Sequence, residues 1–170
     1  TVFVNDIPDE SGLSDSTRFE LTVNPVNDAP TIGLPESFTF AEDAVLNVNF
    51  AQFIDDIDED VLTLTASGYD SVLVVLGGFE VAFAAVANWN GTETLTFTVE
   101  DLSEIASDSV DIIVTSVNDA PVILGQIELA LPEDIPLPIT LSDLFVTDVD
   151  NTYPDDFTLT VLEGEHYTVD

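Results

Sequence analysis

The chain has 170 residues, and its 34 acidic residues against a single Arg give it a formal net charge of −33. Without a basic stripe the chain has nothing to neutralise phosphates, which excludes nucleic acid as a partner and argues against an anionic membrane surface. Hydrophobic residues still make up 45% of the chain, enough to bury a core, and no apolar run is long enough to insert into a membrane.

This excess of negative charge needs compensation, because self-repulsion destabilises any compact state. The chain offers Arg18 as its only Lys or Arg, and with no Cys it forms neither disulfides nor thiolate metal sites. High salt screens exposed charges, whereas carboxylates gathered into clusters indicate specific binding of hard divalent cations, which take oxygen ligands. The distribution of the acidic residues along the chain decides between these two explanations.

The first 26 residues contain two segments with alternating apolar side chains. Val2 and Val4 belong to the first, and Phe19, Leu21 and Val23 to the second. A period of two is typical of a strand with one buried face, so both segments are predicted to be β-strands.

A five-residue motif, Val-Asn-Asp-Ala-Pro, then marks an internal repeat. It occupies Val26–Pro30 and returns 91 residues later at Val117–Pro121. Further blocks match in the same order, namely Glu42-Asp43 with Glu133-Asp134 and, 92 residues apart, Asp56–Asp58 with Asp148–Asp150. Such self-similarity predicts tandem domains. We divide the chain into the last strands of one repeat (1–26), a whole repeat (27–116) and the first part of a third (117–170).

The whole repeat reads as all-β. Short alternating or apolar segments, separated by Gly and Asx turns, lie at residues 45–50, 62–64, 72–76, 81–86, 92–99 and 109–116. Residues 83–87 also fit a single helical turn. About seven short strands in roughly 90 residues predict a Greek-key β-sandwich.

On the residues of its linkers and acidic loops, the chain resembles the cadherin-like tandem repeats of large bacterial surface proteins and adhesins. The shared features are the two Val-Asn-Asp-Ala-Pro linkers, the Glu-Asp pair after each, the Asp-x-Asp loops, the Asn90–Thr92 turn and Glu100-Asp101. The resemblance implies Ig/cadherin-like sandwiches joined end to end, with neighbouring repeats of the same chain as partners and calcium at the junctions. It also implies an extracellular, cell-surface segment that extends or presents an adhesive region.

The resemblance and the oxygen chemistry of Ca²⁺ together predict the ligands, because loops cluster at the two ends of a sandwich. At the first junction we expect the linker and two loops to converge through Asn27, Asp28, Asp56, Asp58 and Asp101.

At the second junction, Asn118 and Asp119 are expected to meet Asp148 and Asp150 of the following repeat. Glu42 is a further candidate there, because cadherin-like domains use an early Glu at their far end. Glu133 would serve a third junction in the same way.

Two other interpretations of these motifs are simpler. Asx-Pro segments favour turns without any metal. The spacing of Asp56, Asp58 and Asp60 also resembles the start of an EF-hand, but the sixth position of that loop is Val61 instead of Gly, and the twelfth is Ser67 instead of Glu. The EF-hand is therefore excluded.

Other functions are alternatives to a calcium-stiffened segment. Trp89 is either an aromatic platform of a carbohydrate-binding module for surface glycans or a core plug, and the plug is favoured. A self-assembling filament or surface-layer subunit, in which further copies complete each other's sheets, is a second alternative. An enzyme is not expected, because the chain has few nucleophiles and general bases and its carboxylates recur at each linker.

Overall fold

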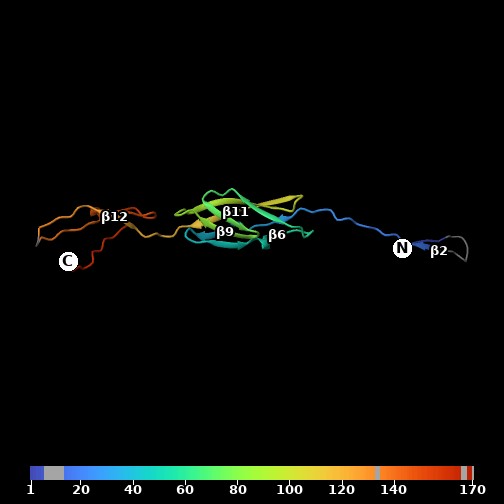
Figure 1. The fold of residues 1–170 in the computed structure, drawn as a ribbon, viewed down its shortest axis with the longest axis horizontal. Coiled ribbons are helices and arrows are strands. Elements are labelled where there is room, and N and C mark those ends of the chain that lie inside the picture. The colour runs from blue at the N-terminus through green and yellow to red at the C-terminus, as the bar shows by residue number, and fades with distance from the viewer. Residues whose placement is uncertain (6–13, 133–134, 166–167, 170) are drawn as a thin grey trace.

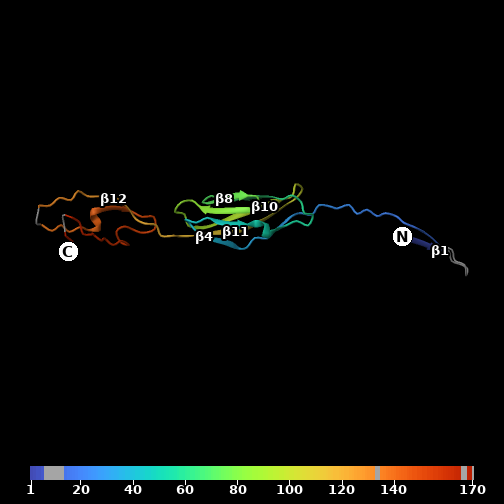
Figure 2. The same cartoon turned by 60° about the horizontal axis from the view of Figure 1, so that its bottom comes forward.

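The computed structural model describes residues 1–5, 14–132, 135–165 and 168–169. The chain is drawn out along one axis, with a small hairpin at one end, an extended segment, a two-layered middle part and a looser C-terminal part (Figures 1 and 2). In the part of the chain just defined, no helix combines the length and apolar character needed to cross a membrane.

The middle part is a β-sandwich built from a four-stranded and a three-stranded sheet. The first sheet has the order β4-β11-β10-β7, with β4 parallel to β11 and the other pairs antiparallel. Its strands are β4 (Ser37–Ala41), β11 (Ile105–Thr115), β10 (Gly91–Glu100) and β7 (Thr63–Ser67). The second sheet, β5-β9-β8, consists of β5 (Leu46–Asn49), β9 (Glu80–Ala85) and β8 (Val72–Gly77). A short pair, β3 (Thr31–Ile32) with β6 (Ile54–Asp55), and a 3-10 turn, η1 (Phe50–Phe53), complete it.

Alternation along the strands builds the core between the two sheets. Leu95, Phe97 and Val99 of β10 are fully buried, and the residues between them are Thr and face outward. Ring contacts in the core join five phenylalanines, and the rings of Phe50 and Phe97 are 4.6 Å apart. The five are Phe38, Phe50, Phe53, Phe83 and Phe97. The prediction of an all-β sandwich is confirmed, and residues 83–85 lie in strand β9 instead of a helical turn.

The parts on either side of the sandwich hold little regular structure. The N-terminal hairpin pairs β1 (Val2–Asn5) with β2 (Ser14–Thr17). The C-terminal part pairs β12 (Val122–Gln126) with β13 (Leu144–Thr147), which follows the 3-10 turn η2 (Leu141–Asp143). The three-part division of the chain stays a prediction.

The predicted strand at residues 18–23 is not formed. Strand β2 ends at Thr17, and Phe19, Leu21 and Val23 are 64–82% exposed. In the repeat alignment these three residues match Val110, Ile112 and Val114, which are buried because β11 lies between two partner strands, β10 and β4. Residues 18–23 pair with no strand among the described residues, so their alternation alone does not make a strand.

Candidate metal centres at the two linkers

The first acidic cluster lies in the loop that follows β6. One carboxylate oxygen from each of Asp56, Asp58 and Asp60 falls within 4.8 Å of the other two. The loop folds around Asp56, whose Oδ1 accepts the backbone N–H groups of Asp58 (3.0 Å) and Asp60 (3.2 Å). Three carboxylates are thereby held together in spite of their mutual repulsion.

The first linker is bonded to this loop and to the turn between β10 and β11. The N–H of Asp28 donates to Oδ2 of Asp58 (2.7 Å), and the amide of Asn27 donates to Oδ2 of Asp101 (3.0 Å). Asp101, only 3% exposed, also accepts the N–H groups of Ser103 and Glu104. The bonds from Asn27, Glu104 and Ser103 lower the pKa of Asp101, so this carboxyl is charged at neutral pH.

The second linker repeats this arrangement with the loop after β13. The N–H of Asp119 donates to Oδ2 of Asp150 (2.6 Å), just as that of Asp28 donates to Asp58. Oδ1 of Asp148 accepts the N–H groups of Asp150 and Asn151, and the amide of Asn151 reaches Oδ1 of Asn118 (3.0 Å). The bond from the linker Asp to the second Asp of the loop therefore recurs at both linkers, whereas the linker Asn donates to Asp101 at the first and accepts from Asn151 at the second.

The middle sandwich adds a buried carboxylate to the second linker. Glu42, 6% exposed and directly after β4, accepts the N–H of Val117 with Oε1 at 2.7 Å. Desolvation, followed by the charges of Asp43, Asp150, Glu42 and Asp148, raises the pKa of Asp119. The charges of four carboxylates therefore act together on this one linker residue.

The pKa of Asp148 shifts in the opposite direction from that of Asp119. Burial raises its pKa, but the hydrogen bonds donated by Asp150 and Asn151 outweigh burial, and the pKa of Asp148 is lowered. The loop therefore holds Asp148 in its charged form.

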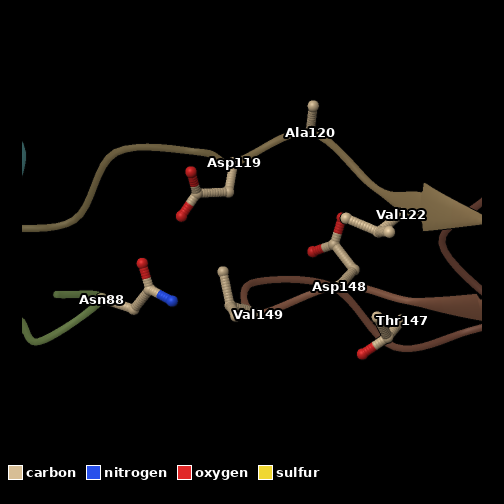
Figure 3. Close-up of a pocket in the computed structure, with 7 residues that line it drawn as sticks. All are labelled: Asn88, Asp119, Ala120, Val122, Thr147, Asp148 and Val149. Atoms are coloured by element: carbon tan, nitrogen blue, oxygen red, sulfur yellow. The ribbon is translucent and has the colours of Figure 1, made fainter.

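A pocket of about 200 Å³ opens between the sandwich and the second linker (Figure 3). Its walls are formed by Asn88, Asp119, Ala120, Val122, Thr147, Asp148 and Val149. The amide of Asn88 and the carboxylate of Asp119 point toward one another, and the Asp148 carboxylate faces the same space. Asn88 has a positive φ of 59°, a conformation that Asn adopts more readily than most residues.

A hard cation fits this set of donors. Oδ2 of Asp56 and Oδ2 of Asp148 are both buried without a hydrogen-bond partner in the described part of the chain, and the two residues match in the repeat. A buried, charged oxygen without a partner is costly, and a bound cation removes that cost. The residues at both linkers offer only oxygen donors, from carboxylates, Asn side chains and backbone carbonyls. This is the ligand chemistry of Ca²⁺.

At the first linker, hydrogen bonds join Asn27 to Asp101 and Asp28 to Asp58. At the second, Asp119 bonds to Asp150 and feels the charges of Glu42 and Asp148. Among the described residues, three carboxylates close enough to share one ion are found at Asp56, Asp58 and Asp60 alone.

Four residues near the two linkers were not predicted as ligands, namely Asp43, Asp60, Asn88 and Asn151. Asp43 and Asp60 extend motifs that the sequence analysis already marks, whereas Asn88 follows β9 by three residues and lines the pocket together with Asp119. Glu133 lies outside the described residues.

A family model described as a bacterial Ig domain matches residues 27–115, just over half of the chain. The chain belongs to the bacterial Ig domain family. No curated protein matches the sequence.

Solved structures that match the chain include two domains (EC1-2) of human protocadherin-24, at 25% identity and a TM-score of 0.48, covering 74% of this chain and 62% of that one. An endo-fucoidan hydrolase of glycoside hydrolase family 107 matches at 22% identity and a TM-score of 0.45, covering 64% and 16%. The titin domains z1z2 in complex with telethonin match at 15% identity and a TM-score of 0.35, covering 60% and 55%. The chain thus spans less than two thirds of each of these structures.

In this bacterial Ig domain, Trp89 packs as a partly buried residue against the hydrophobic core. Gly91, with a φ of +150°, lies under its ring, where a Cβ would come within 3.2 Å of the indole. This packing favours a plug over a sugar platform. The Asn-Gly turn at residues 90–91 therefore has a backbone reason of its own.

Proposed function

We propose that the chain is a calcium-stiffened extracellular segment that extends or presents an adhesive part of a larger cell-surface protein. The observation that carries this proposal is the matched pair of orphaned oxygens, Asp56 Oδ2 and Asp148 Oδ2, one beside each linker. Membership of the bacterial Ig domain family supports the extracellular extension or adhesion role.

The mechanism we propose is electrostatic. Bound Ca²⁺ supplies positive charge and accepts several oxygen ligands from loops that otherwise repel one another. The chain itself supplies the alignment, because the N–H groups of Asp28 and Asp119 hold each linker against the Asp-x-Asp loop that follows it. Neutralised carboxylates on both sides of a linker then restrict its bending, and a flexible string of sandwiches becomes a rod.

This proposal gives neither linker a catalytic role. The same carboxylates recur at both linkers, which fits structural cation sites, whereas an active site usually occurs once. The chain therefore acts through its shape and stiffness.

Thermal unfolding with CaCl₂, compared with EGTA and compensating NaCl at equal ionic strength, tests this function. Cations that bind the folded state stabilise it by about 2.7 kcal/mol at 100-fold excess over Kd. We expect a calcium-dependent rise in Tm that is reduced in Asp56→Asn and in Asp148→Asn. Glu36→Gln removes one exposed carboxylate away from both linkers and is expected to keep the full response.

Stiffening itself needs a measurement of shape. We expect small-angle X-ray scattering to indicate that the conformations of the chain vary less in maximum dimension in CaCl₂ than in EGTA. The proposal would be overturned if neither the Tm nor the scattering profile changed when calcium is added.

A further inference from the structure

Strand β8 is an edge strand with an unusual composition. In the sheet order β5-β9-β8 it pairs with β9 alone, so its other edge has no strand partner in the described residues. Its sequence, Val-Leu-Val-Val-Leu-Gly, contains no charged residue and no Pro. Natural proteins usually protect an exposed edge with charges, Pro or a bulge, because free N–H and C=O groups pair with any available strand.

The outer face of β8 is apolar as well. Leu73 is 50% exposed and Val75 67% exposed, and they pair across the sheet with Ala84 and Ala82. We add to these four residues Val45, which lies directly before β5 and is exposed. We call these five residues the β8 patch. The outer face of the other sheet differs, since Thr and Ser of β10 and β11 bond to one another there.

Charge indicates what covers this patch. One residue in five of the chain is acidic, yet the β8 patch and the whole of β8 have no carboxylate. Two acidic copies repel each other over most of their surfaces and approach at the least electrostatic cost where both are neutral. A basic partner, by contrast, is drawn to the acidic linkers. The carboxylates nearest to β8 lie at its two ends, since Oε2 of Glu93 accepts the N–H of Val72 at 2.7 Å and Glu80 pairs with Gly77. The middle of the strand is left without a charge.

We propose that β8 pairs antiparallel with β8 of a second copy, which makes a two-fold symmetric dimer side by side. Such pairing gives main-chain hydrogen-bond partners to the part of the edge beyond Val72, whose N–H already donates to Glu93, and joins the two β8 patches into one apolar surface. One strand pair buries less than the roughly 1,200 Å² of a stable interface, so the dimer is weak. This lateral contact goes beyond the proposed function, which concerns the ends of the sandwich, and it needs no calcium.

Sedimentation equilibrium of the whole chain, in CaCl₂ and in EGTA, tests the proposal. We expect a monomer at low ionic strength and a dimer in about 1 M NaCl, where the Debye length is about 3 Å. Val75→Glu places two carboxylates at the centre of the contact and is expected to raise the dimer Kd about ten-fold or more. Thr65→Glu adds the same charge to the exposed face of β7 and is expected to dimerise as the wild type does.

A third variant separates this contact from the exposed segment at residues 18–23. Leu21→Glu is expected to leave the dimer unchanged, with folding of every variant checked by circular dichroism. A wild type that stays monomeric in high salt would overturn the proposal. So would association that Leu21→Glu abolishes and Val75→Glu leaves intact. Because each measurement is repeated in EGTA, failure of the dimer and failure of the calcium sites are distinguishable.

Discussion

The side-chain amide of Asn27 donates a hydrogen bond of 3.0 Å to Oδ2 of Asp101, 74 residues later in the chain. This bond fastens the first linker to the turn between β10 and β11. Of the donors that stabilise the charged form of Asp101, Asn27 lowers its pKa most, ahead of the N–H groups of Glu104 and Ser103.

Acid unfolding without calcium reports on this contact. Because the folded pKa of Asp101 lies below its ordinary value of 3.8, its stabilisation is present above that value and is lost as the pH falls through the folded pKa. In Asn27→Ala the pKa of Asp101 is expected to rise, so the loss begins at a higher pH. An NMR titration of the Asp101 carboxyl carbon measures this. Asn24→Ala, in the same exposed segment, is the control, and an unmoved Asp101 pKa in Asn27→Ala contradicts the prediction.

Asp119 is expected to behave in the opposite way. Its folded pKa is raised by desolvation and by the surrounding carboxylates, so folding favours its protonated form. The stability contributed by protonated Asp119 is complete below 3.8 and is lost as the pH rises through the folded pKa. Asp119→Asn should therefore raise the Tm in EGTA at neutral pH and shrink the rise that calcium produces. Differential scanning calorimetry measures both, with Glu36→Gln as the matched loss of one charge. A lower Tm in EGTA for Asp119→Asn would contradict this account.

Much of the fold and of the site is predictable from local patterns in the sequence. Alternation identified β10, because Leu95, Phe97 and Val99 occupy one face of a strand that is buried on that side. The repeat identified both linkers, since the contact between Asp28 and Asp58 recurs between Asp119 and Asp150. Spacing suffices where a residue's partner lies in the same repeated motif.

The local sequence pattern does not identify the segments, far away in the chain, with which a residue pairs. Phe19 has the same alternating neighbours as Val110, but only Val110 lies between two partner strands and becomes buried. Asn88 has no acidic neighbour to mark it, and it reaches the second linker through the path of β9. Both differences depend on which segments pair in space, a property of the whole sheet.

The contrast between Phe97 and Phe19 gives a test of stability. Phe97 is fully buried, with its ring near those of Phe50 and Phe83, so Phe97→Ala is expected to destabilise the sandwich by about 3–5 kcal/mol. Phe19→Ala is expected to change stability by less than about 0.5 kcal/mol, because its ring is mostly exposed. Urea unfolding followed by circular dichroism compares the two. A large loss of stability in Phe19→Ala would show that residues 18–23 pack in solution.

Glu93 lies in β10 but stabilises the start of strand β8. Its carboxylate accepts the backbone N–H groups of Asp70 (2.6 Å), Ser71 (3.2 Å) and Val72 (2.7 Å), and so fixes the start of β8. Glu93→Ala leaves these donors without that partner and is expected to cost about 1–3 kcal/mol.

Glu93→Gln tests whether charge or shape matters, because the amide keeps one acceptor oxygen in place of two. We expect it to lie between the wild type and Glu93→Ala in urea unfolding, since hydrogen bonds to a charged acceptor are stronger than those to a neutral one. Hydrogen exchange at Val72 locates the effect, because a freed N–H loses protection before the rest of the sandwich unfolds. Equal stability of the wild type and both variants would mean that the loop before β8 is held by other contacts, such as the 2.8 Å bond from the N–H of Val86 to the carbonyl of Ser71.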